Sequence, residues 1–144
     1  MDDDKIYEIL NFILGKIGKT KLVWRLEGSA NLRVLGMEVS VRDLDIVTDK
    51  DGFDFFRKRF VEFFVKEEYS KEKKQHNLSY KLFNEELEIL LYENSEESMF
   101  NDVENKTWRG LKLKVLPLRS AKRFYELIKR PEKVKLINMH LEKK

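Results

Sequence analysis

Residues 22–48, which read LVWRLEGSANLRVLGMEVSVRDLDIVT, constrain the fold of this chain more than any other stretch. Their hydrophobic pattern predicts a short strand over residues 22–26, a brief helix over residues 30–35 and a second strand over residues 42–48. A glycine-serine turn joins the first strand to the helix. We expect the rest of the chain to pack around this strand–turn–helix–strand unit.

The second predicted strand carries the run Asp43-Leu44-Asp45. Because side chains alternate along a strand, Asp43 and Asp45 point to one face while Leu44 and Ile46 point to the other. Two strand positions span roughly 6.5 Å between Cα atoms, so the carboxylates can converge on one divalent ion or on a pair. Metal pairs that drive in-line displacement at phosphorus lie roughly 3.5–4 Å apart, a separation that such carboxylates can bridge.

The turn at Gly28 and Ser29 suits the other half of a metal–phosphate site. Glycine lets the backbone approach a phosphate closely, and free N–H groups at the start of the following helix favour an anion. The Ser29 hydroxyl can donate a hydrogen bond to a phosphate oxygen. The unit therefore predicts a site for a metal-bound nucleoside triphosphate.

The Gly28-Ser29 pair, thirteen intervening residues and the acidic run that begins at Asp43 resemble the signature of the nucleotidyltransferase superfamily related to DNA polymerase beta. The similarity is greatest to the minimal nucleotidyltransferases and to the lincosamide and aminoglycoside nucleotidyltransferases. It extends from about residue 22 to about residue 135. The resemblance implies an α+β nucleotidyltransferase fold of two α/β layers, in which helices pack mainly on one face of a mixed β-sheet.

In that family a third carboxylate lies on a later strand between apolar residues, and Glu88 within LEILLY fits this context. Residues 78–83 and 87–92 predict two strands joined as a hairpin. Burying an unpaired carboxylate is costly, so a metal site shared with Asp43 and Asp45 would explain Glu88. The alternatives are an edge strand with Glu88 in water, or Glu86 in its place if the register shifts by two.

Proline residues at 117 and 131 predict the starts of two C-terminal helices with many basic side chains. A solvated charged face is one reading of them. The resemblance implies instead that Arg130 and Lys133 help to hold the triphosphate or the acceptor, with Lys129 as the alternative. Many relatives follow the lysine with an aspartate, whereas Val134 stands here.

Other segments have simpler interpretations. Helical spacing of apolar residues predicts helices over residues 3–17 and 53–65, the second capped by Asp51. Residues 66–77, KEEYSKEKKQHN, have little apolar content and predict an exposed loop. Lys71, Lys73 and Lys74 of this segment could contact phosphate or RNA, but interleaved acids favour a solvated segment. Residues 94–105 predict an acidic loop with a helical turn around Met99-Phe100. In the last helix, Val134, Ile137 and Leu141 are expected to pack inward.

Composition limits the class of protein. With 144 residues the chain is expected to form a single domain, residues 1–144, with a core over about residues 20–116 and C-terminal helices over residues 117–142. A net charge of +3 does not by itself indicate nucleic acid, and the lack of cysteine excludes disulfides and cysteine-based metal sites. No membrane-spanning apolar run or signal peptide is evident, so a cytoplasmic location is expected.

These features predict a nucleotidyltransferase that uses Mg2+, in a site that can take two ions, to move a nucleoside monophosphate from a nucleoside triphosphate to an acceptor hydroxyl. Asp43, Asp45 and Glu88 are the predicted catalytic and metal-binding residues. The acceptor stays open between a small molecule, a protein and RNA. An alternative from the resemblance is an antitoxin-type interaction protein that binds or nucleotidylates a small helical toxin. A homodimer is also compatible with so small a catalytic core.

Overall fold

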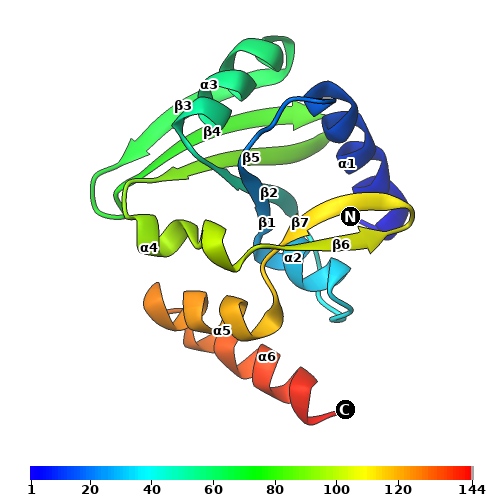
Figure 1. The fold of residues 1–144 in the computed structure, drawn as a ribbon, viewed down its shortest axis with the longest axis vertical. Helices are drawn as coiled ribbons and strands as arrows, with labels where there is room; N and C mark the ends of the chain where they lie inside the picture. Colours follow the sequence, from blue (N-terminus) through cyan, green and yellow to red (C-terminus); the bar gives the residue numbers. More distant parts are fainter. Residues whose placement is uncertain (144) are drawn as a thin grey trace.

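A computed structural model describes residues 1–143 of the chain, and within them seven strands form a five-stranded sheet and a separate two-stranded hairpin (Figure 1). In chain order the strands are β1 (Trp24–Glu27), β2 (Asp43–Thr48), β3 (Phe64–Ser70), β4 (Gln75–Leu82), β5 (Glu85–Tyr92), β6 (Glu104–Trp108) and β7 (Leu111–Val115). The helices are α1 (Asp3–Ile17), α2 (Gly28–Val34), α3 (Lys50–Arg59), α4 (Ser95–Ser98), α5 (Leu118–Leu127) and α6 (Pro131–Glu142), with short 3-10 turns η1 (Val61–Phe63) and η2 (Phe100–Asp102).

The large sheet is mixed, with the strand order β1-β2-β5-β4-β3. Strands β2 and β5 are parallel, whereas β1 pairs with β2, β4 with β5 and β3 with β4 in antiparallel fashion. The parallel register sets Asp43 beside Glu86 and Asp45 beside Glu88. The predicted α+β class with a mixed sheet is confirmed.

Apolar side chains of α1 and α3 cover one face of this sheet (Figure 1). Ile6, Phe56, Leu44 and Tyr80 are all at most 1% exposed in this layer. Complete burial of such a side chain contributes roughly 1.5–3 kcal/mol, so this layer supplies much of the folding free energy. The opposite face carries the acidic side chains of β2 and β5, and a second apolar cluster joins its end to α5 and α6.

The first helix and the strand–turn–helix–strand unit follow the prediction closely. Helix α1 spans residues 3–17, and its N-cap Asp2 accepts a hydrogen bond from the backbone N–H of Lys5 at 2.9 Å. Strand β2 begins at Asp43 and α2 begins at Gly28. Local turn and capping signals were therefore sufficient to predict the secondary structure of the first third of the chain.

The predicted helix over residues 53–65 is wrong in its second half, because α3 ends at Arg59. Its N-cap is Asp49, whose side chain accepts a hydrogen bond from the N–H of Gly52 at 2.9 Å, and not Asp51. The loop predicted over residues 66–77 is wrong as well, since β3 and β4 form a hairpin there. Strand β3 is an edge strand whose side chains are mostly exposed, so it lacks the alternating apolar pattern that reveals a half-buried strand.

Two smaller corrections concern the C-terminal third. In the predicted acidic loop over residues 94–105, η2 corresponds to the expected helical turn around Met99-Phe100, but the segment also contains α4 and the start of β6. Strand β6 pairs with β7 through a turn at Arg109 and Gly110. In α6, Ile137 is fully buried as expected, but Leu141 is 44% exposed and does not pack inward. Among the described residues, no helix combines the length and apolar character that a bilayer crossing requires.

Candidate active site

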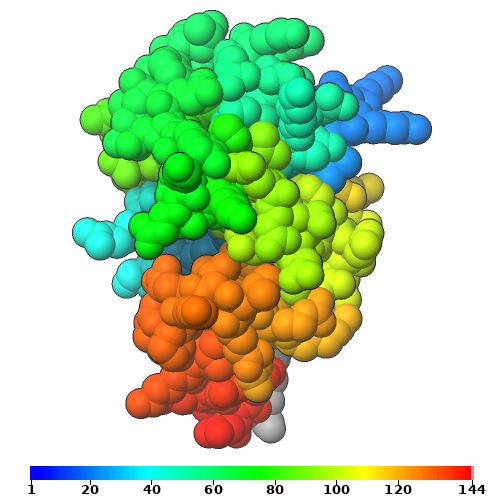
Figure 2. Space-filling model, turned by 90° about the vertical axis from the view of Figure 1, so that its left-hand side faces the viewer, coloured from blue at the N-terminus to red at the C-terminus, as the bar shows by residue number. Residues whose placement is uncertain are grey.

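Three predicted acidic residues line one cavity on the sheet face opposite α1 and α3. Asp43 and Asp45 extend from β2, Glu88 extends from the neighbouring β5, and all three border a cavity of about 420 Å³. Figure 2 shows the hollow between the tip of the β3–β4 hairpin, in green, and the α5–α6 pair, in orange, with blue atoms of the N-terminal part at its floor. The parallel pairing of β2 with β5 therefore brings together residues that are more than forty positions apart.

A group of oxygen ligands lies at the outer end of this acidic floor. One carboxylate oxygen each from Asp43, Glu86 and Glu88 lies within 4.8 Å of the other two. Asp45 is the next residue of β2 on the same face after Asp43. It lies beside Glu88 in the parallel register but is not part of that group. Carboxylate oxygens are the ligands that Mg2+ prefers, so this donor set fits a hard divalent cation, with Glu86 joining the residues predicted from sequence.

The electrostatics of the cluster also fit a cation. Burial raises the pKa of Asp45 well above its usual value, and the nearby charges of Asp43, Glu27 and Glu88 raise it further. Burial, followed by the charge of Glu86, raises the pKa of Asp43. Burial likewise raises the pKa of Glu88, partly offset by hydrogen bonds from Asn77 and Ser79. Crowded carboxylates that resist ionisation would be stabilised as anions by a bound divalent ion.

Gly28 lies directly against one of these acids. Its φ is +69°, and a Cβ built at this position would lie only 2.8 Å from Oδ2 of Asp45. Any other residue would therefore be both strained and in steric conflict with the carboxylate. Ser29 follows in the first turn of α2 and is partly buried. The predicted glycine-serine turn is thus adjacent to the acidic strand, although the two residues do not border the cavity itself.

The three basic candidates from the C-terminal helices take different positions. Arg130, at the N-terminus of α6, lines the acidic cavity and pairs with Glu132. Lys133 is near enough for its charge to lower the pKa of Asp45, against the larger raising effect of burial. Lys129 lines a different cavity, of about 690 Å³, between α5 and α6. Arg130 and Lys133 are therefore better placed than Lys129 to meet an anion at the acids.

Sequence reasoning missed several residues of the cavity wall. Glu27, at the end of β1, lies opposite Asp45 and is buried. Tyr92 shares the face of Glu88 by strand alternation and donates a hydrogen bond from its hydroxyl to Glu27 at 2.7 Å. Lys73, at the tip of the β3–β4 hairpin, also borders the cavity. Alternation along β1 and β5 was the available signal for Glu27 and Tyr92, whereas the sequence allows Lys73 a phosphate contact but favours a solvated segment there.

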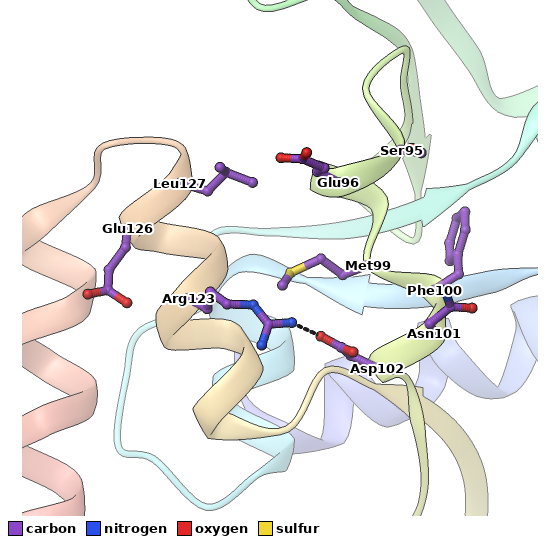
Figure 3. A pocket seen from close by; sticks show the side chains of 9 residues that line it. All are labelled: Ser95, Glu96, Met99, Phe100, Asn101, Asp102, Arg123, Glu126 and Leu127. Carbon is purple, nitrogen blue, oxygen red and sulfur yellow. Dashed lines mark hydrogen bonds and ion pairs between the residues drawn. The ribbon is translucent and has the colours of Figure 1, made fainter.

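A second cavity, of about 620 Å³, lies between α5 and the α4–η2 segment (Figure 3). Its wall is largely apolar, with Met99 and Leu127 facing the opening, and Arg123 crosses it to pair with Asp102. Glu126 points away from the centre of this cavity. No group of potential metal ligands converges there among the described residues, so the acidic cavity is the candidate active site.

Comparison with known proteins identifies the fold of this chain. No protein-family model matches the chain, and no curated protein matches it by sequence. A solved structure of a candidate nucleotidyltransferase from Thermotoga maritima aligns with a TM-score of 0.75 at 22% identity, over 100% of this chain and 97% of that one. The lincomycin-bound lincosamide antibiotic adenylyltransferase LnuA aligns with a TM-score of 0.62 at 15% identity, over 96% of this chain and 97% of that one. The chain therefore has the nucleotidyltransferase fold, as its sequence resemblance implied.

Proposed function

We propose that this protein is a metal-dependent nucleotidyltransferase, which moves a nucleoside monophosphate from a nucleoside triphosphate to an acceptor hydroxyl and releases pyrophosphate. The observation that carries this proposal is the convergence of Asp43, Asp45 and Glu88 on one cavity beside the Gly28 turn. Nucleotidyltransferase-like neighbours over nearly the full chain support it. The acceptor is undefined, and a small molecule, a protein and RNA are all chemically suitable because each offers hydroxyl groups.

Asp43 and Glu88, with Asp45 or Glu86, would hold Mg2+ through carboxylate oxygens in a site with room for two ions. When bound, the metal neutralises phosphate charge and stabilises the leaving pyrophosphate. Asp45 is the most deeply buried of these acids and faces four other charges, so its anionic form depends most on a cation nearby. Magnesium is the expected ion, because it suits oxygen-only sites that retain water.

The protein's own groups would position the nucleotide and transfer a proton. Backbone N–H groups at Gly28 and Ser29 would bind phosphate oxygens, and Arg130 and Lys133 would balance the triphosphate charge. The acceptor oxygen forms a bond to the α-phosphorus as the bond from the α-phosphorus to the bridging oxygen of pyrophosphate breaks. Glu88 would either share the metal or accept the acceptor's proton, with its carboxylate held by the Ser79 hydroxyl at 3.2 Å.

The direct test incubates the purified protein with α-labelled nucleoside triphosphates, Mg2+ and a cell extract, and follows transfer of label to an acceptor. We expect labelling that EDTA abolishes and that Asp45→Asn reduces to background without loss of the folded state. Asp51→Asn is the matched control, because Asp51 is an exposed acid on α3, the helix that packs on the opposite face of the sheet from the acidic cluster. Undiminished transfer by Asp45→Asn would reject the assignment.

The second candidate function is an antitoxin-type interaction protein that binds or nucleotidylates a small helical partner. Exposed apolar side chains on α6 favour it, since Leu136 is 40% exposed and Met139 is 47% exposed. Exposed apolar groups on one helix can serve as contacts for a partner helix. A gene for a small helical protein beside this one would favour this reading, and co-expression followed by size-exclusion chromatography would test for a complex.

A further inference from the structure

Glu27 is an acid of the cavity wall whose two carboxylate oxygens are already engaged. It is 8% exposed and lies opposite Asp45 across the β1–β2 pair. Nη2 of Arg25 donates to its Oε1 at 3.1 Å, and the hydroxyl of Tyr92 donates to its Oε2 at 2.7 Å. Hydrogen bonds from a charged donor and a buried hydroxyl hold an anion firmly in place. Glu27 thus differs from Asp43, Glu86 and Glu88, whose oxygens converge on one another.

Arg25 links this carboxylate to the helices that wall the cavity. Its side chain is fully buried, and its Nε and Nη2 atoms donate to the backbone oxygens of Ser98 and Glu97 at 2.7 and 3.0 Å. Its guanidinium group lies over the ring of Phe124 on α5, 5.1 Å from the ring centroid. One side chain therefore connects β1, α4 and α5.

Such a network is an expensive way to fill a protein interior. Removing two charges from water costs several kcal/mol per ion, and well-packed apolar residues often stabilise a core at least as much. A purely structural role therefore does not account well for Arg25 and Glu27. Their location offers a better account, because Glu27 immediately precedes Gly28, whose backbone lies against the carboxylate of Asp45. Fixing Glu27 fixes the start of this turn.

We propose that Glu27, Arg25 and Tyr92 are positioning residues of the nucleotide site, and that Glu27 does not bind the metal. The network holds the Gly28 turn at a fixed distance from Asp45. The phosphate that the turn binds and the metal that the acids bind are then held at a fixed distance from each other. It also couples this geometry to the α4–α5 wall through Arg25. The inference rests on the proposed nucleotidyltransferase function and adds residues that neither the sequence pattern nor the fold assigns.

The test compares Tyr92→Phe with Tyr125→Phe in binding of a fluorescent, non-hydrolysable ATP analogue at a series of Mg2+ concentrations. Tyr125 is the matched control, because it is similarly buried on α5 and because burial, followed by the nearby charge of Glu27, raises its pKa. The hydrogen bonds to Glu27 come instead from Arg25 and Tyr92. Tyr92→Phe removes one donor from Glu27 and is expected to raise the Kd about 5- to 10-fold, the net contribution of one typical hydrogen bond. Tyr125→Phe is expected to stay within about twofold of the wild type.

Two Glu27 variants separate positioning from metal binding. Glu27→Asp keeps the charge but withdraws the carboxylate by one methylene, so it should lose affinity as Tyr92→Phe does. In Glu27→Asp the Mg2+ concentration for half-maximal binding should stay unchanged, whereas Glu27→Gln also removes a charge that acts on Asp45 and should weaken nucleotide binding. Thermal unfolding of each variant establishes that it is folded. If Tyr92→Phe does not fold, Glu27→Gln replaces it as the test of the positioning role.

The outcomes distinguish this inference from the proposed function. If the wild type binds the analogue with Mg2+ but Tyr92→Phe and the Glu27 variants bind equally well, the positioning role is overturned and the nucleotidyltransferase proposal stands. A shifted Mg2+ requirement in Glu27→Asp, which keeps the charge, would make Glu27 a metal ligand and would also overturn it. If the wild type shows no Mg2+-dependent binding of any nucleotide, the proposed function fails and this inference fails with it.

Discussion

Asp45 on β2 and Glu88 on β5 lie side by side in the parallel register of the sheet, although 42 residues separate them. Each is partly buried, and the charge of Glu88 contributes to the raised pKa of Asp45. Two like charges at such a position destabilise the empty site and favour a cation. This relationship underlies the expected behaviour of the protein with metal, pH and substitution.

The metal-free protein should lose stability as the pH rises. Burial and neighbouring acids raise the pKa of Asp45 above its usual 3.8 in the folded state, so the folded state holds the proton more tightly than the unfolded chain. Stability is then fully present below about pH 4 with respect to this group, and falls as the pH rises through the folded-state pKa. Thermal unfolding in EDTA across this range measures the effect. Asp45→Asn should flatten the dependence of stability on pH. Mg2+ should stabilise the wild type more than the variant. Equal responses of the two proteins would contradict the charge-crowding account.

Glu88→Gln should lower the rate of nucleotidyl transfer by roughly 10²–10⁴-fold if Glu88 accepts the proton of the attacking hydroxyl. Glutamine keeps the shape of the Glu88 side chain. Ser79, whose hydroxyl lies 3.2 Å from a carboxylate oxygen of Glu88, can still form a hydrogen bond with the amide. Glu86→Gln is the matched control on the same face of β5, and it should chiefly raise the Mg2+ requirement. Single-turnover rates at saturating Mg2+ separate the two. Equal losses in both variants would count against a distinct proton-accepting role for Glu88.

Gly28→Ala should destabilise the fold by about 1–3 kcal/mol, because alanine is strained at positive φ and its Cβ would meet Oδ2 of Asp45. It should also weaken nucleotide binding, since the turn must shift away from the acid. Gly36→Ala is the control: its φ is +100° but nothing lies within 4 Å of the added Cβ. Urea unfolding and nucleotide titration of both variants measure these effects. Loss of affinity in Gly36→Ala as well would show that general destabilisation, not the Gly28–Asp45 contact, is responsible.

Arg130→Ala should weaken nucleoside triphosphate binding by about tenfold, and the loss should shrink at high salt as exposed charges are screened. Lys129→Ala should change affinity little, because the acidic cavity is lined by Arg130 and not by Lys129. The two residues are adjacent in sequence and alike in charge, so the pair isolates the effect of position. Titration at low and high ionic strength decides between them, and a larger effect of Lys129→Ala would reverse the assignment.

Tyr80→Phe should leave the free energy of unfolding unchanged or raise it by up to about 1–3 kcal/mol. Tyr80 is 1% exposed on β4, and its buried hydroxyl has no hydrogen-bond partner among the described residues. Removing an unsatisfied buried hydroxyl removes a desolvation penalty. Urea unfolding gives the change in free energy directly. A clear loss of stability would mean that the hydroxyl finds a partner in solution.

Much of the fold was predictable where local signals act alone. The helix over residues 3–17, the turn at Gly28 and the strand bearing Asp43 all follow from periodicity and capping. Strand β3 was missed because an exposed edge strand has no buried face to give it a pattern. The roles of the predicted site residues remain predictions, to be decided by the experiments above.

The sequence by itself determined which chemical groups are present and which face of its own strand each one takes, because alternation is a local property of the backbone. Only the tertiary structure decided which faces meet. The β2–β5 register set Asp45 beside Glu88 and brought Glu86 to Asp43, and antiparallel pairing of β1 buried Glu27 against the same acids. Strand register and helix rotation depend on packing between distant segments, which no local pattern encodes. For the same reason, sequence could not choose between Lys129 and Arg130, whereas the turn between α5 and α6 directs Arg130 to the acidic cavity.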